Sequence, residues 1–191
     1  MPFLVFNTAT NRFHRDKKTN QNPVMIQLSW WRNDQPEPIC CLIRPPPGTT
    51  IDPATIPYHG LAMADLERDG QPAADVIKEM ELAAGDSKTI LVAFNAEFHF
   101  RQLYRTMGIP DAKPPATSVD VMAMAAPILK LPLMRPGGGF KSPSLRECCQ
   151  FFDLPEPALA EADPLDIAES TVRAVRGVYE ACLENGTPRA A

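Results

Sequence analysis

The sequence lacks an excess of positive charge, a long apolar run and any paired-cysteine metal motif. Its 19 lysine and arginine residues are outnumbered by 23 aspartate and glutamate residues, which gives a formal net charge of −4. This balance excludes a strongly basic nucleic-acid coat protein. No apolar run approaches the roughly 18 residues that a membrane span requires, so we expect no membrane partner. Residues 1–6 lack the basic and long apolar regions of a signal peptide, and we expect them to form a strand.

Cysteine is present, but its pattern is typical of neither a metal site nor a disulfide framework. Adjacent cysteines point in different directions on a strand or a helix, which disfavours a zinc site. The odd number and the absence of Cys-x-x-Cys spacing favour reduced, mostly buried thiols in a cytoplasmic protein. The five cysteines are Cys40, Cys41, Cys148, Cys149 and Cys182.

Length and composition predict one folded domain over residues 1–191. Apolar residues make up 45% of the chain and charged residues 22%, which is typical of a globular protein and not of a disordered one. Proline is abundant, with 21 residues, but these are scattered between patterned segments. We therefore expect the prolines to mark loops within the domain and not a linker between domains.

Hydrophobic patterning predicts an α/β fold. Three early β-type runs are close enough in sequence to form an antiparallel meander, and helices and strands alternate after them. This order predicts a mixed sheet with helices on both faces. The predicted strands cover residues 3–6, 24–31, 39–43, 89–94 (fully buried) and 118–121, with a polar stretch over residues 8–22. The predicted helices cover residues 73–84, 95–107, 121–129, 144–152 and a long segment from residue 164, with a flexible connection over residues 132–143.

Capping residues define the starts of three of these helices. Asn95 and Asp163 are predicted N-caps, and Ser144 with Glu147 three residues later forms a capping box. Pro164 suits the first helical position. The last helix has an apolar stripe that is expected to face the core, formed by Leu165, Ala168, Val172, Val175, Tyr179 and Cys182.

Six short segments at the joints of these elements resemble the DnaQ-like 3′–5′ exonucleases of the DEDDh type. They are FNTAT at 6–10, YHGL at 58–61, VAFNAEFH at 92–99, SVD at 118–120, SLRE at 144–147 and ADPLDIAEST at 162–171. The resemblance covers nearly the whole chain. It implies an RNase H-like exonuclease fold, with a mixed five-stranded sheet flanked by helices.

The catalytic residues of that family are absent. The family places Asp-x-Glu at the end of its first strand, His-Asn-Ala-x-Phe-Asp in its second motif and a His five residues before an Asp on its last helix. Two-metal phosphodiester cleavage needs oxygen ligands that hold two Mg²⁺ or Mn²⁺ ions. The corresponding positions here offer one neutral amide, one imidazole and otherwise no ligand, which predicts a pseudoenzyme without metal or cofactor. These degenerate positions are Asn7, Ala9, Phe94, His99, Ala162 and Ile167.

Two alternatives retain an active 3′–5′ exonuclease on DNA or RNA, in which Mg²⁺ or Mn²⁺ would be the cofactor. In the first, Asn7 and Ala9 are inactivating substitutions in an active enzyme, which leaves the other changes unexplained. In the second, the last helix is shifted so that Asp166 replaces the lost aspartate. One residue rotates a helix by about 100°, and the apolar stripe opposes that rotation. The carboxylates available as substitute ligands are Glu97, Asp120, Asp163 and Asp166.

The remaining polar residues indicate where a partner would bind. The loop after the first strand borders the substrate groove in the family that the chain resembles, and its basic residues, with Asn95, are candidate binding residues. We expect a binding module for single-stranded nucleic acid or for a protein; a structural subunit of a larger assembly is a third hypothesis. His59 matches a structural histidine, and Trp30 and Trp31 are expected to pack in the core. The basic residues are Arg12, Arg15, Lys17 and Lys18, with Arg101, Arg105, Lys141 and Arg146 as possible additions to the same face.

Overall fold

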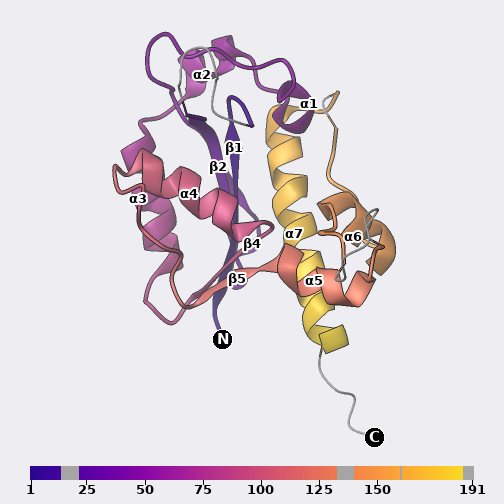
Figure 1. The fold of residues 1–191 in the computed structure, drawn as a ribbon. Coiled ribbons are helices and arrows are strands. Elements are labelled where there is room, and N and C mark those ends of the chain that lie inside the picture. The colour runs from indigo at the N-terminus through magenta and orange to yellow at the C-terminus, as the bar shows by residue number, and fades with distance from the viewer. Residues whose placement is uncertain (14–21, 133–139, 160, 187–191) are drawn as a thin grey trace, which may run out of the picture.

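The computed structural model describes residues 1–13, 22–132, 140–159 and 161–186, and its chain forms a mixed five-stranded sheet with helices on both faces (Figure 1). The strands lie in the order β3-β2-β1-β4-β5. β1 pairs antiparallel with β2 and β2 with β3, whereas β1–β4 and β4–β5 are parallel. The predicted fold class is therefore confirmed.

The element bounds follow the predicted order closely. The strands are β1 (Phe3–Thr10), β2 (Met25–Arg32), β3 (Ile39–Leu42), β4 (Ile90–Ala93) and β5 (Ser118–Asp120). The helices are α1 (Ile56–His59), α2 (Met63–Asp69), α3 (Ala73–Ala84), α4 (Ala96–Thr106), α5 (Val121–Leu129), α6 (Leu145–Phe152) and α7 (Pro164–Gly186).

Alternation along β1 divides the core into two layers. Leu4 and Phe6 face one side of the sheet, where they pack in a cluster with residues of α3 and α4. Val5 faces the other side, where α5, α6 and α7 supply the cluster. Phe6 contacts Phe100 of α4 with ring centroids 5.0 Å apart. Residues 7 and 9 of β1 therefore point toward α7, and residue 8 points toward α4.

β1 is longer than predicted, because its polar end is buried and paired. The polar stretch was expected to begin at residue 8, but Ala9 and Thr10 still pair with β2. Thr8 and Thr10 are both buried, and the Thr10 hydroxyl donates to the Arg12 carbonyl (2.8 Å). Burial of a polar group is tolerated where it is hydrogen-bonded, so the strand continues. Patterning also missed the short helices α1 and α2, and β4 is only half-buried at its first two residues.

All three predicted N-cap residues stand at the start of their helices, but only two of them cap with the side chain. The Ser144 hydroxyl accepts from the Glu147 N–H and a capping box forms, and Asp163 Oδ1 accepts from the Leu165 N–H (2.8 Å). Asn95, by contrast, adopts a left-handed conformation (φ 63°), and its side chain makes no cap hydrogen bond. Leu165 is also 47% exposed and not inward as predicted, whereas the rest of the stripe is buried. Ile167 and Ala168 take the buried side of α7 at this end, and Leu165 lies on the exposed side.

The tryptophans and cysteines lie where the sequence predicts. Trp30 is buried in the core, and Trp31 packs against α7, with the Arg176 guanidinium 4.0 Å from its ring centroid. All five cysteines are free and four of them are buried. The predicted connection over residues 132–143 falls mostly outside the described residues.

We predict that Gly70→Ala destabilises the fold through a steric clash. Gly70 has an ordinary backbone conformation, but a Cβ there would lie 2.2 Å from the Leu66 carbonyl oxygen and 2.7 Å from the Arg44 nitrogen. Relieving such an overlap is expected to lower the free energy of unfolding by about 1–3 kcal/mol, measured by urea denaturation. Gly177→Ala is the control, because its Cβ would meet only the Leu154 side chain, at 3.3 Å, inside a helix that favours alanine. An equal loss of stability in both variants would contradict the prediction.

Candidate functional site

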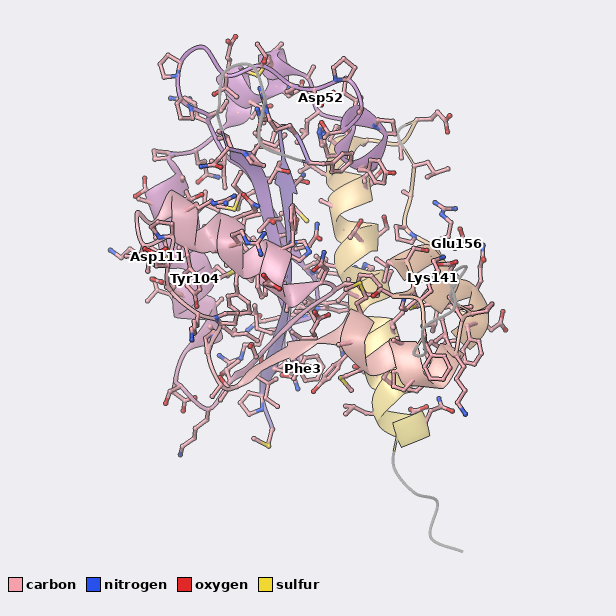
Figure 2. All side chains as sticks on the ribbon, in the orientation of Figure 1. Phe3, Asp52, Tyr104, Asp111, Lys141 and Glu156 are labelled. Carbon is pink, nitrogen blue, oxygen red and sulfur yellow. The ribbon has the colours of Figure 1, made fainter. Side chains whose placement is uncertain are left out.

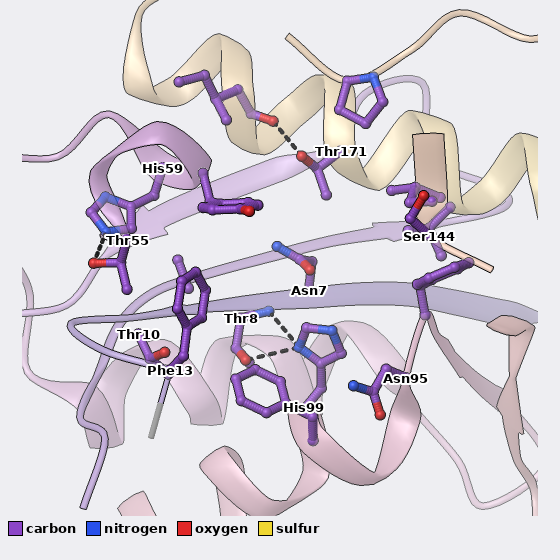
Figure 3. Close-up of a pocket in the computed structure, with 18 of the residues that line it drawn as sticks. Asn7, Thr8, Thr10, Phe13, Thr55, His59, Asn95, His99, Ser144 and Thr171 are labelled. Carbon is purple, nitrogen blue, oxygen red and sulfur yellow. Dashed lines mark hydrogen bonds between the residues drawn. The ribbon is translucent and has the colours of Figure 1, made fainter. Parts of the chain in front are cut away.

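A groove of about 1120 Å³ lies at the carboxyl ends of β1 and β4, between α4 and α7 (Figure 3). Its floor is the second half of β1, and the segment after β4 and the first turns of α4 form one wall. α7, α1 and the loop before α6 complete the lining. The carboxyl ends of parallel strands are the usual ligand position in open α/β sheets. The groove is therefore the candidate functional site.

Five of the six degenerate positions meet in this groove, although they come from three separate parts of the chain. The sixth, Ala162, lies just before α7 and does not line it. Ile167 is 2% exposed and lines the groove, whereas its neighbour Asp166 is exposed and points elsewhere. The helix is thus in the phase that the resemblance implies. The residues brought together are Asn7, Ala9, Phe94, His99 and Ile167.

His99 is hydrogen-bonded to β1 and is held neutral. Its Nδ1 accepts from the Thr8 main-chain N–H (3.1 Å) and lies 2.9 Å from the Thr8 hydroxyl, as the dashed lines in Figure 3 show. Burial lowers the pKa of His99 to about 4, which outweighs a hydrogen bond with the Phe94 main chain that acts in the opposite direction. An Nδ1 that accepts a main-chain N–H carries no proton, so the ring's proton is on Nε2. The imidazole of His99 therefore has a structural role in the fold.

His59 has the structural role that the sequence predicts. It is 2% exposed, its Nδ1 accepts from the Leu61 N–H (3.0 Å), and its Nε2 lies 3.1 Å from the Thr55 hydroxyl. Burial lowers the pKa of His59 to about 4. Both ring nitrogens are occupied within the loop around α1, although the residue lines the groove.

The four carboxylates considered as substitute metal ligands do not converge. Asp120 Oδ1 accepts from the Met122 and Asn95 N–H groups (both 3.0 Å), and Asp163 caps α7. Glu97 lines the groove but pairs with Arg101 one turn along α4. Within the described ranges, no group of three or more His, Cys, Asp or Glu side chains could hold a metal ion.

The groove does not suit a pair of Mg²⁺ or Mn²⁺ ions. These ions prefer carboxylate oxygens, and two-metal catalysis needs several of them around one point. At the motif positions, Asn7 offers a neutral amide oxygen, and Ala9 and Ile167 offer no donor. His99 has Nδ1 engaged with β1 and would supply nitrogen, which is a poor ligand for Mg²⁺. No hydrolytic step through a divalent metal follows from these residues.

The cations of the groove are paired with carboxylates. Arg101 and Arg146 line it, and each forms an ion pair, Arg101 with Glu97 and Arg146 with Glu156. Lys141 lies beside α6, as Glu156 does (Figure 2), and pairs with Glu147. Neither Lys141 nor Arg105 lines the groove. Arg12 is also outside the lining and lies 3.4 Å from the Thr50 hydroxyl through Nη2. Arg15, Lys17 and Lys18 lie outside the described residues.

Sequence reasoning missed the aromatic part of the lining. Phe13 and Tyr58 meet edge to face with ring centroids 5.1 Å apart, and Phe98 lies on the α4 side. These residues are far apart in sequence or lie in loops, where periodicity carries no signal. The one indication of this lining in the sequence was the position of Tyr58 directly before His59. Together with Phe94, these rings give the groove an aromatic lining.

Comparison with known proteins finds similarity in structure but not in sequence. No protein-family model matches the chain, and no curated protein matches it. In structure the chain is similar to E. coli exonuclease I in complex with a dA16 oligonucleotide, with a TM-score of 0.66 and 15% identity over 97% of this chain and 41% of that one. It is also similar to cell-death related nuclease 4 (CRN-4), with a TM-score of 0.67 and 12% identity over 97% of this chain and 64% of that one. Apo exonuclease I gives a TM-score of 0.67 at 15% identity over 96% of this chain and 42% of that one.

These similarities show the fold. The chain has the α/β fold of the DnaQ-like exonucleases, which the short motif segments predicted. It spans about two fifths of the length of exonuclease I. No helix in the described part of the chain has the length and apolar character needed to cross a membrane.

We predict that His99 makes the fold sensitive to mild acid. Its pKa is about 4 in the folded chain against an ordinary 6.5, so between these values the unfolded chain binds a proton that the folded chain does not. Stability therefore falls as pH falls from 6.5 to 4, with a slope of about 1 kcal/mol per pH unit for this histidine. His99→Asn should remove that contribution from the slope measured by urea unfolding at pH 6 and pH 5. An unchanged slope in the variant would mean that the pKa of His99 is the same in the folded and the unfolded chain, and it would contradict the prediction.

Proposed function

We propose that this protein is a catalytically inactive member of the DnaQ-like exonuclease family that acts as a binding module. The observation that supports this proposal is the groove itself. It has the position of a functional site in an α/β sheet and a volume of about 1120 Å³, yet the residues at its motif positions are neutral. A groove of this size that contains no catalytic ligand set is suited to binding and not to cleavage.

The chemistry of phosphodiester hydrolysis has no support from these side chains. Cleavage needs metal-bound oxygen to activate water and to neutralise the leaving oxygen, and a base to accept the proton. The position of the family's general base is Ala162, and the imidazole of His99 has its free electron pair engaged with Thr8. The alternative, a 3′–5′ exonuclease on DNA or RNA with an altered divalent-metal site, would need ligands from outside this arrangement.

The ligand that we propose is a macromolecule, either single-stranded nucleic acid or a protein. The groove exceeds the range of about 300–1,000 Å³ in which small-molecule sites fall. One solved structure that shares the fold is exonuclease I in complex with an oligonucleotide. The five free cysteines fit the cytoplasmic location that we propose.

The purified protein is expected to show no exonuclease activity in Mg²⁺ or Mn²⁺. The assay uses 5′-labelled single-stranded DNA and RNA, with E. coli exonuclease I as the positive control and a mock preparation as the background. The expected result is no shortened product above that background, because no carboxylate occupies the motif positions. Chelator-sensitive trimming from the 3′ end that Glu97→Gln or Asp166→Asn abolishes would overturn the inactive assignment and support the altered-metal enzyme.

A further inference from the structure

We propose that the groove binds an extended polypeptide segment with apolar side chains, whose main-chain amides pair with Asn7 and Asn95. This inference rests on the proposed binding function and selects one of its two ligand classes. Three features of the lining support it: two carboxamides that make no hydrogen bond within the described part of the chain, exposed apolar side chains at the rim, and cations that are already paired with carboxylates.

The two carboxamides face the groove with their hydrogen-bonding groups available. Asn7 lies at the middle of the floor and Asn95 at the start of α4 (Figure 3). Neither side chain makes a hydrogen bond to any residue that the structure describes. A carboxamide carries a donor and an acceptor side by side, and this pattern is complementary to the N–H and C=O groups of a peptide chain. A ligand main chain would supply both partners.

The rim of the groove exposes large apolar side chains. Phe13 is 40% exposed, Tyr58 69% and Leu159 52%, and all three line the groove. Phe94 and Ile167 add further apolar side chains to the lining. Exposed apolar side chains that gather around a concave surface are typical of an interaction site. Apolar side chains of a bound segment would cover them, because alternate residues of an extended chain point to the same side.

The charges of the described lining offer little attraction for a phosphate backbone. Its two arginines, Arg101 and Arg146, are engaged in ion pairs with Glu97 and Glu156. Each pair carries no net charge, so the described lining presents no unpaired cation to a phosphate. Nucleic-acid grooves instead carry an excess of positive charge along the backbone path. An uncharged main chain needs no such excess.

The experiment selects peptides and then tests their main-chain contacts. A phage-displayed library of random dodecapeptides is panned on the wild-type chain, and the most enriched peptide is synthesised with a fluorescent label. Its dissociation constant is measured by anisotropy for the wild type, Asn7→Ala and Asn95→Gly. Glycine is chosen at position 95 because φ is 63° there, a conformation that glycine adopts without strain. Asn185→Ala, which removes an exposed carboxamide near the end of α7, is the matched control.

The expected result is enrichment of peptides with alternating apolar residues, and a dissociation constant that rises about 3- to 10-fold in Asn7→Ala and in Asn95→Gly but not in Asn185→Ala. N-methylation of one peptide amide at a time should weaken wild-type binding at one or two positions. That loss should disappear in the variant whose carboxamide pairs with the methylated amide. Unchanged melting temperatures keep the comparison independent of folding.

Two results would overturn the inference. One is no enrichment, or enriched peptides that bind all four proteins equally. The other is tighter binding of a labelled dT15 oligonucleotide that displaces the peptide and weakens steeply between 50 and 200 mM salt. The oligonucleotide result leaves the proposed binding module standing with nucleic acid as its ligand. If neither the peptides nor the oligonucleotide bind, the proposed binding module is contradicted as well. Nuclease activity would contradict only the proposal that the protein is catalytically inactive.

Discussion

The hydrogen bond between the Thr8 main-chain N–H and Nδ1 of His99 determines the character of the groove floor. It joins the start of α4 to the polar end of β1, at a position that the family resemblance assigns to a metal-binding carboxylate. Protonation of Nδ1 would set two donors against each other, so the contact keeps the ring neutral. Because the ring is also buried, no positive or negative charge is left at the centre of the site.

The close approach of α1 to α7 fixes the opposite wall. Gly60 has φ 66°, and a Cβ there would lie 3.0 Å from Cδ1 of Ile167. This contact requires glycine for its backbone conformation and for its lack of a side chain. Ile167 also lines the groove, at a position that the resemblance assigns to a carboxylate. One wall is therefore fixed by a buried hydrogen bond and the other by close packing.

Local sequence signals were enough to predict the sheet and most helices. The period of two in the strands, the caps at Ser144 and Asp163 and the ordered motif segments each depend on residues close in sequence. The features that were missed depend on tertiary contacts. The end of β1 is polar and becomes a strand only because β2 and His99 satisfy it, and Leu165 is exposed because Ile167 and Ala168 take the buried side of α7. The aromatic contact between Phe13 and Tyr58 and the pairing of Arg146 with Glu156 likewise join segments that no local pattern relates.

The melting temperature in Mg²⁺ and in EDTA tests the central claim most directly, namely that this groove has lost its metal site. Four carboxylates that converge repel one another until metal binds, and metal at 100 times its dissociation constant then stabilises a fold by about 2.7 kcal/mol. The account predicts that millimolar Mg²⁺ and EDTA give melting temperatures within about a degree for the natural chain. A variant with Asn7→Asp, Ala9→Glu, His99→Asp and Ile167→Asp should melt lower without metal and recover with Mg²⁺. A clear Mg²⁺-dependent rise in the natural chain would contradict the account.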